Sequence, residues 1–289
     1  MNKAKILVTG SNGQLGSELQ DLAAAFPQFE LLFFTRESFP INDADRADKI
    51  FEELRPQFLV NCAAYTAVDK AESENELASE INGIAVGQLA FLCKKYDARF
   101  IHISTDYVFN GNKTEPWKED DATDPVNAYG ASKLLGEYKA AKNNPESIII
   151  RTSWVYSSHG KNFVKTMMRL MREKESISVV NDQWGSPTYA ADLAEAIMKI
   201  VASDEWLPGI YHYSNEGVIN WYQFACEIKK LTGSACSVHP IPTEQFPTPA
   251  KRPGYSVMDK SKIKQAYSLS LKDWRESLQI CIQKLTATL

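Results

Sequence analysis

Short, continuously apolar segments alternate with helical ones through the first half of the chain. The apolar segments, which we interpret as strands, are residues 5–10, 30–34, 57–62, 99–104 and 147–156. Stretches typical of helices separate them, for example QLGSELQDLAAAF and AYGASKLLGEYKAA. Strands that are apolar on both faces are typical of a parallel sheet covered by helices on both sides. With right-handed crossovers, this pattern predicts an α/β fold with a doubly wound parallel sheet of the Rossmann type.

The alternation weakens after residue 156. FVKTMMRLMREK and AADLAEAIMKIVA read as helices, the second packing back on the sheet, and SISVVND reads as a strand. Prolines gather in an irregular segment at 240–254, which is typical of a linker or a binding loop. The stretch SLKDWRESLQICIQKL predicts a last helix with Ser270 as its N-cap. We expect a Rossmann domain of residues 1–155 plus about 174–202, and a smaller C-terminal α/β lobe of about 156–173 and 203–289.

Composition excludes several classes of function. The 289 residues carry a net charge of only −4 and contain no basic block, so we expect no binding to nucleic acid. No long apolar run or apolar leader is present, so we expect neither a membrane span nor a targeting segment. Five widely spaced cysteines argue against a disulfide scaffold and favour the cytoplasm. Cys62, Cys93, His102 and His212 lie in apolar runs, so we interpret them as core residues and assign no metal ligand.

A glycine-rich turn follows the first strand. Residues 10–16 read GSNGQLG and place Gly10, Gly13 and Gly16 between a strand and a helix. A pyrophosphate approaches the backbone closely only where Cβ atoms are absent, and the helix N-terminus favours its negative charge. An ordinary glycine-rich turn is the alternative, but the strand–turn–helix setting favours dinucleotide binding.

The end of the second predicted strand bears on which nicotinamide cofactor is bound. An acidic residue there would hold the free 2′-hydroxyl of NADH, but the chain continues with Thr35 and Arg36. Arg36 could instead meet the 2′-phosphate of NADPH, or it could be a solvated loop residue. Asn42 and Asp43 could line the adenine pocket, although Asp43 could equally be the N-cap of the next helix. We expect NADPH, with NADH as the alternative.

Two further segments suggest a reaction site. In YGASK, Tyr129 and Lys133 are four residues apart and share one face of a helix. An ammonium nearby would lower the pKa of the phenol and help it donate a proton, although a Tyr-x-x-x-Lys spacing can also arise by chance. Thr105, in STDYVF, follows a strand at the edge where a doubly wound sheet binds its ligands. We therefore expect Thr105 to hydrogen-bond the oxygen that Tyr129 protonates.

Several longer motifs carry a more specific resemblance. They are NCAAYTAVDKAE (61–72), STDYVF, YGASK, RTSWVY (151–156), NDQWGSPT (181–188) and AKRPGYS (250–256). With the glycine loop, they resemble the extended short-chain dehydrogenase/reductase superfamily, and within it the family of dTDP-4-dehydrorhamnose reductases. The resemblance spans nearly the whole chain. It implies NADPH-dependent reduction of the C4 ketone of dTDP-4-dehydro-6-deoxy-L-mannose to dTDP-L-rhamnose.

The resemblance also implies residue roles. The catalytic residues would be Thr105, Tyr129 and Lys133, with Lys133 also holding the nicotinamide ribose. The cofactor would be contacted by Gly13, Gln14, Leu15, Ala63, Ala64, Tyr65 and Thr66. The nucleotide-sugar substrate would be contacted by Thr105, Asp106, Trp154 and Arg252. From the residues alone, Trp154 could be a core aromatic, Asp106 a turn cap, and Arg252 a solvated loop residue.

The resemblance leaves cofactor preference and assembly less defined. Some members carry an acid where Thr35 stands, so their cofactor preference is not transferred to this chain. Some members bind Mg²⁺ between two subunits through carboxylates, which would make a homodimer. The matching carboxylates cannot be identified in this sequence, so Mg²⁺ is not placed.

Two other functions fit the same fold. A sugar-nucleotide epimerase or dehydratase is one, but dehydratases carry Asp-Glu after the threonine, whereas here Asp106 is followed by Tyr107. A nucleotide-binding regulatory subunit without turnover is the other. The complete set of Thr105, Tyr129 and Lys133 argues against it.

Overall fold

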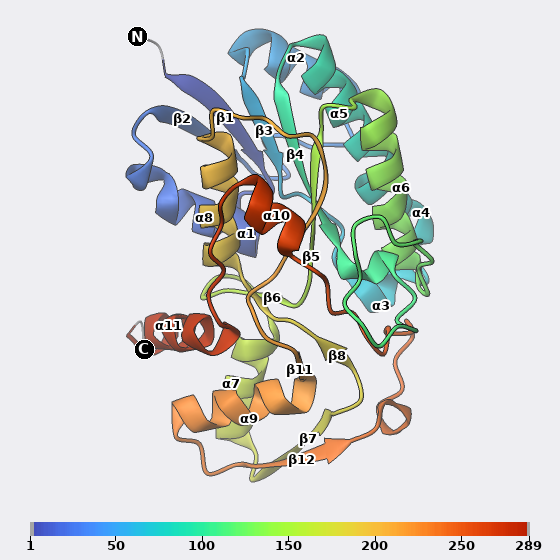
Figure 1. The fold of residues 1–289 in the computed structure, drawn as a ribbon, viewed down its shortest axis with the longest axis vertical. Coiled ribbons are helices and arrows are strands. Elements are labelled where there is room, and N and C mark those ends of the chain that lie inside the picture. Colours follow the sequence, from blue (N-terminus) through green and yellow to red (C-terminus); the bar gives the residue numbers. More distant parts are fainter. Residues whose placement is uncertain (1–2, 288–289) are drawn as a thin grey trace.

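A parallel six-stranded sheet forms the centre of the larger part of the molecule (Figure 1). The computed structural model describes residues 3–287. The strand order is β10-β5-β4-β3-β1-β2, and every pairing is parallel. These strands are β1 (Ala4–Thr9), β2 (Phe29–Phe34), β3 (Phe58–Asn61), β4 (Arg99–Thr105), β5 (Ile148–Thr152) and β10 (Gly209–Tyr213). The predicted α/β class and doubly wound sheet are confirmed.

Helices cover both faces of this sheet, because alternate strand residues are apolar toward each side. Ile6 and Val8 of β1 pack toward one face, whereas Leu7 packs toward the other. The first layer contains α1 (Gln14–Leu22), α8 (Ala190–Val201) and α10 (Ser261–Ala266). The second contains α2 (Ala44–Leu54), α5 (Ala85–Lys95) and α6 (Ala128–Asn143). Before α5 the chain forms α3 (Val68–Ala71), α4 (Asn75–Ser79) and a π-helical turn at Glu80–Ile84.

A smaller lobe has its own core below the sheet in Figure 1. Its helices are α7 (Phe163–Glu173), α9 (Trp221–Thr232) and α11 (Trp274–Ala287). Its short strands pair as β7 (Ser176–Val180) with β12 (Ser237–Ile241), β8 (Trp184–Gly185) with β11 (Ile219–Asn220), and β6 (Val155–Tyr156) with β9 (Thr188–Tyr189). Three 3₁₀ turns lie at Ala23–Ala25, Asp106–Val108 and Thr243–Gln245. No helix within residues 3–287 is long and apolar enough to cross a membrane.

The structure corrects the expected division of the chain. Residues 174–202 were expected together in the Rossmann domain, but β7 pairs with β12 inside the lobe. Residues 203–289 were expected in the lobe, but β10 pairs with β5 at the edge of the main sheet. Both errors arise because pairing partners are distant in sequence and leave no local signal. We propose a domain division in which β10 and α10 belong to the Rossmann part and β7 belongs to the lobe.

Two local predictions are also wrong. The expected single strand at 147–156 is broken, because Trp154 has a φ of +48°, which turns the chain out of the sheet. The last helix begins at Trp274 and is not capped by Ser270. Asp273 accepts a hydrogen bond from the Arg275 N–H at 2.9 Å and so takes the capping position. Asp273 also forms an isolated β-bridge with Glu216.

Candidate active site

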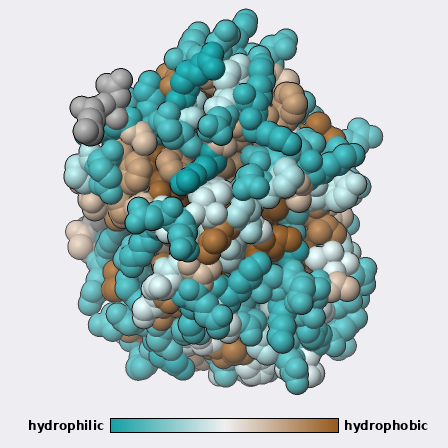
Figure 2. Space-filling view, turned by 45° about the horizontal axis from the view of Figure 1, so that its top comes forward, coloured by the Kyte–Doolittle hydropathy of each residue, from teal (hydrophilic) through white to brown (hydrophobic). Residues whose placement is uncertain are grey.

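A cavity of about 1010 Å³ lies at the carboxyl ends of the central strands. Its wall combines the glycine turn, the ends of β3, β4 and β5, and residues of the smaller lobe. Figure 2 shows apolar residues gathered near the middle of an otherwise mostly hydrophilic face. The cavity is thus large, lined from two parts of the fold, and placed where an open α/β sheet binds ligands.

The glycine turn is shaped for close contact with a ligand backbone. Gly10 has a φ of +64°, and a Cβ there would lie 2.6 Å from the backbone nitrogen of Ala63. Gly13 is the N-cap of α1 and has no side chain that could cap the helix. The first backbone N–H groups of α1 are therefore left without a side-chain acceptor at the cavity wall. Gly16 does not line the cavity, because a Cβ there would lie 2.5 Å from the Gly10 oxygen. Its role is to let α1 pack against the turn.

Residues after β2 form one end of the cavity. Thr35, Arg36 and Asn42 line it, as expected. Asp43 does not, because its carboxylate accepts a hydrogen bond from the Arg46 N–H at 3.0 Å and caps α2. Glu37 also lines this end, although sequence reasoning did not identify it. A cation and a carboxylate therefore stand side by side at this end of the cavity.

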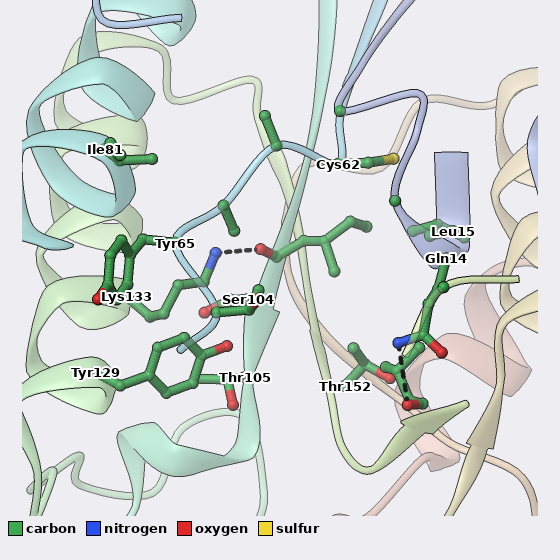
Figure 3. Close-up of a pocket in the computed structure, with 18 of the residues that line it drawn as sticks. Gln14, Leu15, Cys62, Tyr65, Ile81, Ser104, Thr105, Tyr129, Lys133 and Thr152 are labelled. Carbon is green, nitrogen blue, oxygen red and sulfur yellow. Dashed lines mark hydrogen bonds between the residues drawn. The ribbon is translucent and has the colours of Figure 1, made fainter. Parts of the chain in front are cut away.

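The proton-donor candidates meet on the opposite wall. Tyr129 lies near the start of α6, whose N-cap Asn127 accepts a hydrogen bond from the Gly130 N–H at 2.8 Å. Thr105 ends β4, and its hydroxyl, which donates to Asp106 Oδ1 at 3.0 Å, lies beside Tyr129. Figure 3 shows Tyr129, Thr105 and Lys133 around the same space. The structure thus brings together the three side chains expected to be catalytic.

The protonation of Tyr129 differs from the expectation. Burial raises the pKa of Tyr129 to about 12, and the nearby Thr105 hydroxyl only partly offsets this effect. The ammonium of Lys133 is directed away, because its Nζ donates to the Ile103 carbonyl at 2.6 Å and lies 3.3 Å from His102 Nε2. Lys133 is 2% exposed, and burial lowers its pKa to about 8 while Glu137 raises it. The prediction that Lys133 lowers the pKa of Tyr129 is therefore wrong.

Beyond Thr105, the cavity wall becomes aromatic and acidic. Trp154 stacks on Trp221 with ring centroids 3.6 Å apart, and a Cβ at Gly185 would lie 2.7 Å from the Trp154 ring. Trp154 therefore lines the cavity as one member of an aromatic pair.

Asp106 is buried, its Oδ2 has no hydrogen-bond partner, and burial raises its pKa to about 7. A buried carboxyl oxygen without a partner is costly, so this group is suited to receive a polar ligand.

Arg252 contributes from the proline-rich segment. Its Nη2 donates to Asp69 Oδ2 at 2.8 Å, and its side chain is 20% exposed. The charge of Arg252 also acts on Tyr107, which lines the cavity. Arg252 is thus an ion-paired residue beside the cavity and not a solvated loop side chain. Arg252 itself is not among the residues that line the cavity.

Comparison with known proteins identifies the family. A family model described as the RmlD substrate binding domain matches residues 4–287. A dTDP-4-dehydrorhamnose reductase of Burkholderia thailandensis is 40% identical over 97% of this chain and 99% of its own length. The chain belongs to the dTDP-4-dehydrorhamnose reductase family. The spore coat polysaccharide biosynthesis protein SpsK of Bacillus subtilis is 42% identical over 97% of each chain.

A solved structure matches the whole fold. The dTDP-4-dehydrorhamnose reductase of Bacillus anthracis, crystallised in complex with NADP, superposes with a TM-score of 0.94 and is 38% identical. The match covers 98% of this chain and 100% of that one. The resemblance inferred from the motifs is therefore confirmed at the level of family and fold.

Sequence reasoning missed several cavity residues of this dTDP-4-dehydrorhamnose reductase family member. Phe163 and Trp221 reach the cavity from the lobe, and Gly160 and Lys161 join the wall beside Gln14. Their segments carry no motif, and only the lobe packing brings them to the sheet. Asp69 lies within the quoted motif AAYTAVDKAE, where its carboxylate could have been proposed as a partner for a cation.

The comparisons give no support for Mg²⁺ in this family member. Within residues 3–287, one group of potential ligands lies together: Glu18, Asp21 and His159. These side chains already have protein partners, since Glu18 accepts from Ser157 at 2.6 Å and Asp21 lies 2.8 Å from His159.

Proposed function

We propose that this chain reduces the C4 ketone of dTDP-4-dehydro-6-deoxy-L-mannose to dTDP-L-rhamnose, with NADPH as the reductant. The observation that carries the proposal is the meeting of Thr105, Tyr129 and Lys133 in one cavity, in a chain 40% identical to a dTDP-4-dehydrorhamnose reductase. The class, an NAD(P)-dependent oxidoreductase of dTDP-rhamnose biosynthesis, follows from the family. The homodimer and the cytoplasmic location stay predictions.

The cavity fits a dinucleotide. The turn at Gly10 and Gly13 and the open N-terminus of α1 suit a pyrophosphate, because a Cβ at Gly10 would occupy the approach. Arg36 would meet a 2′-phosphate at the far end of the cavity. Further contacts would come from Gln14, Leu15, Thr35, Asn42, Ala63, Ala64, Tyr65 and Thr66, which all line the cavity. When bound, the nicotinamide supplies a hydride to the carbonyl carbon.

The protein's own residues would handle the proton. Thr105 donates a hydrogen bond to the carbonyl oxygen O4 and holds it near the phenol of Tyr129. As the C4–H bond forms, Tyr129 transfers its proton to O4, and the ketone becomes a hydroxyl. The high pKa of Tyr129 keeps the phenol protonated before the reaction. A cation close to the resulting phenolate would stabilise it, and Lys133 is the nearest candidate on the same helix face.

Specificity for a nucleotide sugar would come from the lobe side. The Trp154–Trp221 pair offers apolar ring edges and an indole N–H to the sugar. Asp106 Oδ2 would accept a hydrogen bond from a sugar hydroxyl. Arg252 would hold the diphosphate, exchanging its contact with Asp69 for the ligand.

The test is direct. We expect NADPH oxidation by the purified protein with dTDP-4-dehydro-6-deoxy-L-mannose, and an NMR spectrum that identifies the product as dTDP-L-rhamnose. NADH at the same concentration should be oxidised more slowly. A different C4 epimer, or tightly bound oxidised cofactor that recycles without net NADPH use, would contradict the proposal.

A further inference from the structure

Three polar side chains lie in a row beneath the cavity, on the face of the sheet that α6 covers. Thr9, Asn61 and His102 belong to β1, β3 and β4, and the strand register pairs Thr9 with Asn61 and Asn61 with His102. Paired residues project from the same face, so the three side chains stand side by side. Thr9 and His102 are fully buried, and Asn61 is 1% exposed.

The row is continuously hydrogen-bonded and ends on Lys133. Thr9 Oγ1 lies 2.6 Å from Asn61 Oδ1, and Asn61 Nδ2 lies 3.1 Å from His102 Nδ1. His102 Nε2 lies 3.3 Å from Lys133 Nζ. Figure 3 shows the amine of Lys133 directed to the backbone oxygen that it contacts at the end of β4. His102 is therefore a side-chain contact of the lysine on the protein side of the cavity.

The position of this row is not explained by packing. Two residues earlier, the same three strands carry Leu7, Leu59 and Phe100, which form a buried apolar row on the same face. Polar groups in such a place are favourable only if each is hydrogen-bonded, and apolar residues would fill the space at lower cost. The three strands thus change from apolar to polar side chains at Thr9, Asn61 and His102, which is where Lys133 contacts the sheet.

The hydrogen bonds of the row can run in two directions. An ammonium has only N–H donors, so His102 Nε2 accepts from charged Lys133, and Nδ1–H donates to the oxygen of Asn61. With a neutral Lys133, Nε2–H donates to the amine, and Nδ1 accepts from the nitrogen of Asn61. The Asn61 amide has this second orientation in the structure, since its Oδ1 accepts from Thr9 Oγ1 and its Nδ2 faces His102 Nδ1. A half-turn of the Asn61 amide converts one arrangement into the other. The Thr9 hydroxyl donates to Asn61 Oδ1 when Lys133 is neutral, and its oxygen accepts from Asn61 Nδ2 when Lys133 is charged.

We propose that His102, oriented by Asn61 and Thr9, is a positioning residue that holds Lys133 as an ammonium at the cavity floor and accommodates its neutral form. The proposal rests on the proposed function insofar as Lys133 serves the reduction. Ile103 O accepts one N–H of Lys133, and in the charged arrangement His102 Nε2 accepts a second, so the third N–H of the ammonium remains for the cavity. A neutral imidazole suits this role, because an imidazolium would repel the lysine.

The surrounding charges agree with this assignment. Burial, together with the charge of Lys133, lowers the pKa of His102 well below 6.5, so the ring is neutral at working pH. Lys133 is further faced by Cys62 from the end of β3 and by Glu137 from its own helix. Glu137 is engaged elsewhere, since it accepts from Arg151 Nη2 at 2.7 Å and from the Ser104 hydroxyl. His102 is thus the neutral side-chain acceptor in direct contact with the lysine.

Two substitutions separate the positioning role from a structural one. The amide of His102→Gln extends about as far as Nε2 and can still accept from Lys133. The amide of His102→Asn extends only as far as Nδ1 and can contact Asn61 alone. We expect His102→Asn to lower the pKa of Lys133 by about one unit, because a hydrogen bond to the charged form is lost, whereas His102→Gln should stay near wild type.

The readouts are a titration and a pH profile. NMR of protein labelled with ¹³Cε-lysine gives the pKa of Lys133 directly, with Lys133→Met used to assign its signal. The alkaline limb of kcat/KM for the keto-sugar nucleotide should move to lower pH in His102→Asn by the same amount. If the wild type fails to reduce this substrate, the proposed function fails, and the NMR titration still decides the role of His102.

His212 provides the matched control. It is also fully buried in a strand of the same sheet, and it contacts Arg151 and backbone oxygens but not Lys133. We expect His212→Asn and His212→Gln to reduce stability without moving the Lys133 titration. Equal pKa values of Lys133 in wild type and His102→Asn, or equal shifts in His102→Asn and His102→Gln, would overturn the proposal.

Discussion

Gly130 lies so close to Tyr107 that a Cβ at Gly130 would be 2.2 Å from the Tyr107 carbonyl oxygen. This contact joins the first turn of α6 to the 3₁₀ turn that follows β4. Tyr129 precedes Gly130, and Thr105 lies just before the turn. The separation of the proposed proton donor Tyr129 from Thr105 is therefore set by an approach that only glycine permits.

Substituting Gly130→Ala should displace Tyr129 from Thr105 and reduce kcat by at least about tenfold, since small misplacements of reacting groups are costly. The matched control is Gly136→Ala on the same helix, where a Cβ would meet the Asn82 oxygen at 2.1 Å, away from the phenol. Both variants should lower the melting temperature, which thermal unfolding measures. A smaller loss of kcat in Gly130→Ala than in Gly136→Ala would contradict this account.

Tyr129→Phe removes the proposed proton and little else. Turnover should fall by about 10²–10⁴, the usual contribution of a positioned general acid. The dissociation constant for NADPH, measured by fluorescence titration, should change little, because the cofactor contacts come mainly from the rest of the cavity. Near wild-type turnover in this variant would exclude Tyr129 as the donor.

How far the sequence predicts this site depends on where each residue lies. Tyr129 and Lys133 are one turn apart on a helix, so the helical period predicts that they share a face. Thr105 ends a buried strand, and the carboxyl ends of parallel strands are where such a sheet binds ligands. Asp43 could not be settled, because an aspartate before a helix suits either capping or ligand binding. Trp221 was beyond reach, because its place depends on two-residue strands and on packing of the lobe against the sheet. The effect of Lys133 on the pKa of Tyr129 could not be predicted, because it depends on where Lys133 Nζ points, and the spacing of the two residues does not give that direction.

Arg36 and Glu37 should have opposite effects on cofactor choice, because they line the same end of the cavity. Arg36→Ala should raise the KM for NADPH several-fold and leave that for NADH nearly unchanged, since only NADPH carries the 2′-phosphate. Glu37→Gln should lower the KM for NADPH, because a carboxylate repels the phosphate. Steady-state kinetics with both cofactors tests both variants. Equal effects of Arg36→Ala on NADPH and NADH would show that Arg36 does not read the phosphate.

Asp106 should make stability depend on pH. Its pKa is raised to about 7 in the folded protein but is about 3.9 in an unfolded chain. Above pH 3.9 the unfolded state loses this proton first, so the folded state is progressively penalised as pH rises toward 7. Asp106→Asn removes the penalty and should raise the free energy of unfolding by roughly 2–3 kcal/mol more at pH 8 than at pH 5. Urea unfolding at both pH values measures this difference, and an advantage that is constant or larger at pH 5 would refute it.

Arg252 and Asp69 should govern binding of the diphosphate in opposite ways. The Asp69 carboxylate accepts from the Arg252 guanidinium, with Nη2 and Oδ2 2.8 Å apart, so a diphosphate must displace this carboxylate. Arg252→Ala should therefore raise the KM for the keto-sugar nucleotide by about tenfold or more, because a charge-assisted contact is lost.

Asp69→Asn, which frees the guanidinium but keeps the shape of the side chain, should lower that KM, and in the double variant its benefit should vanish. Arg275→Ala, which removes an exposed arginine on α11, serves as the control and should leave KM unchanged.

The same comparison with the free 4-keto sugar separates diphosphate capture from sugar binding. Because that substrate has no diphosphate, Arg252→Ala should not affect it, and the wild-type enzyme should use it far more slowly than the dTDP conjugate. Equal turnover of the two substrates, or an Arg252→Ala enzyme with unchanged kcat/KM for the conjugate, would remove Arg252 from the binding site.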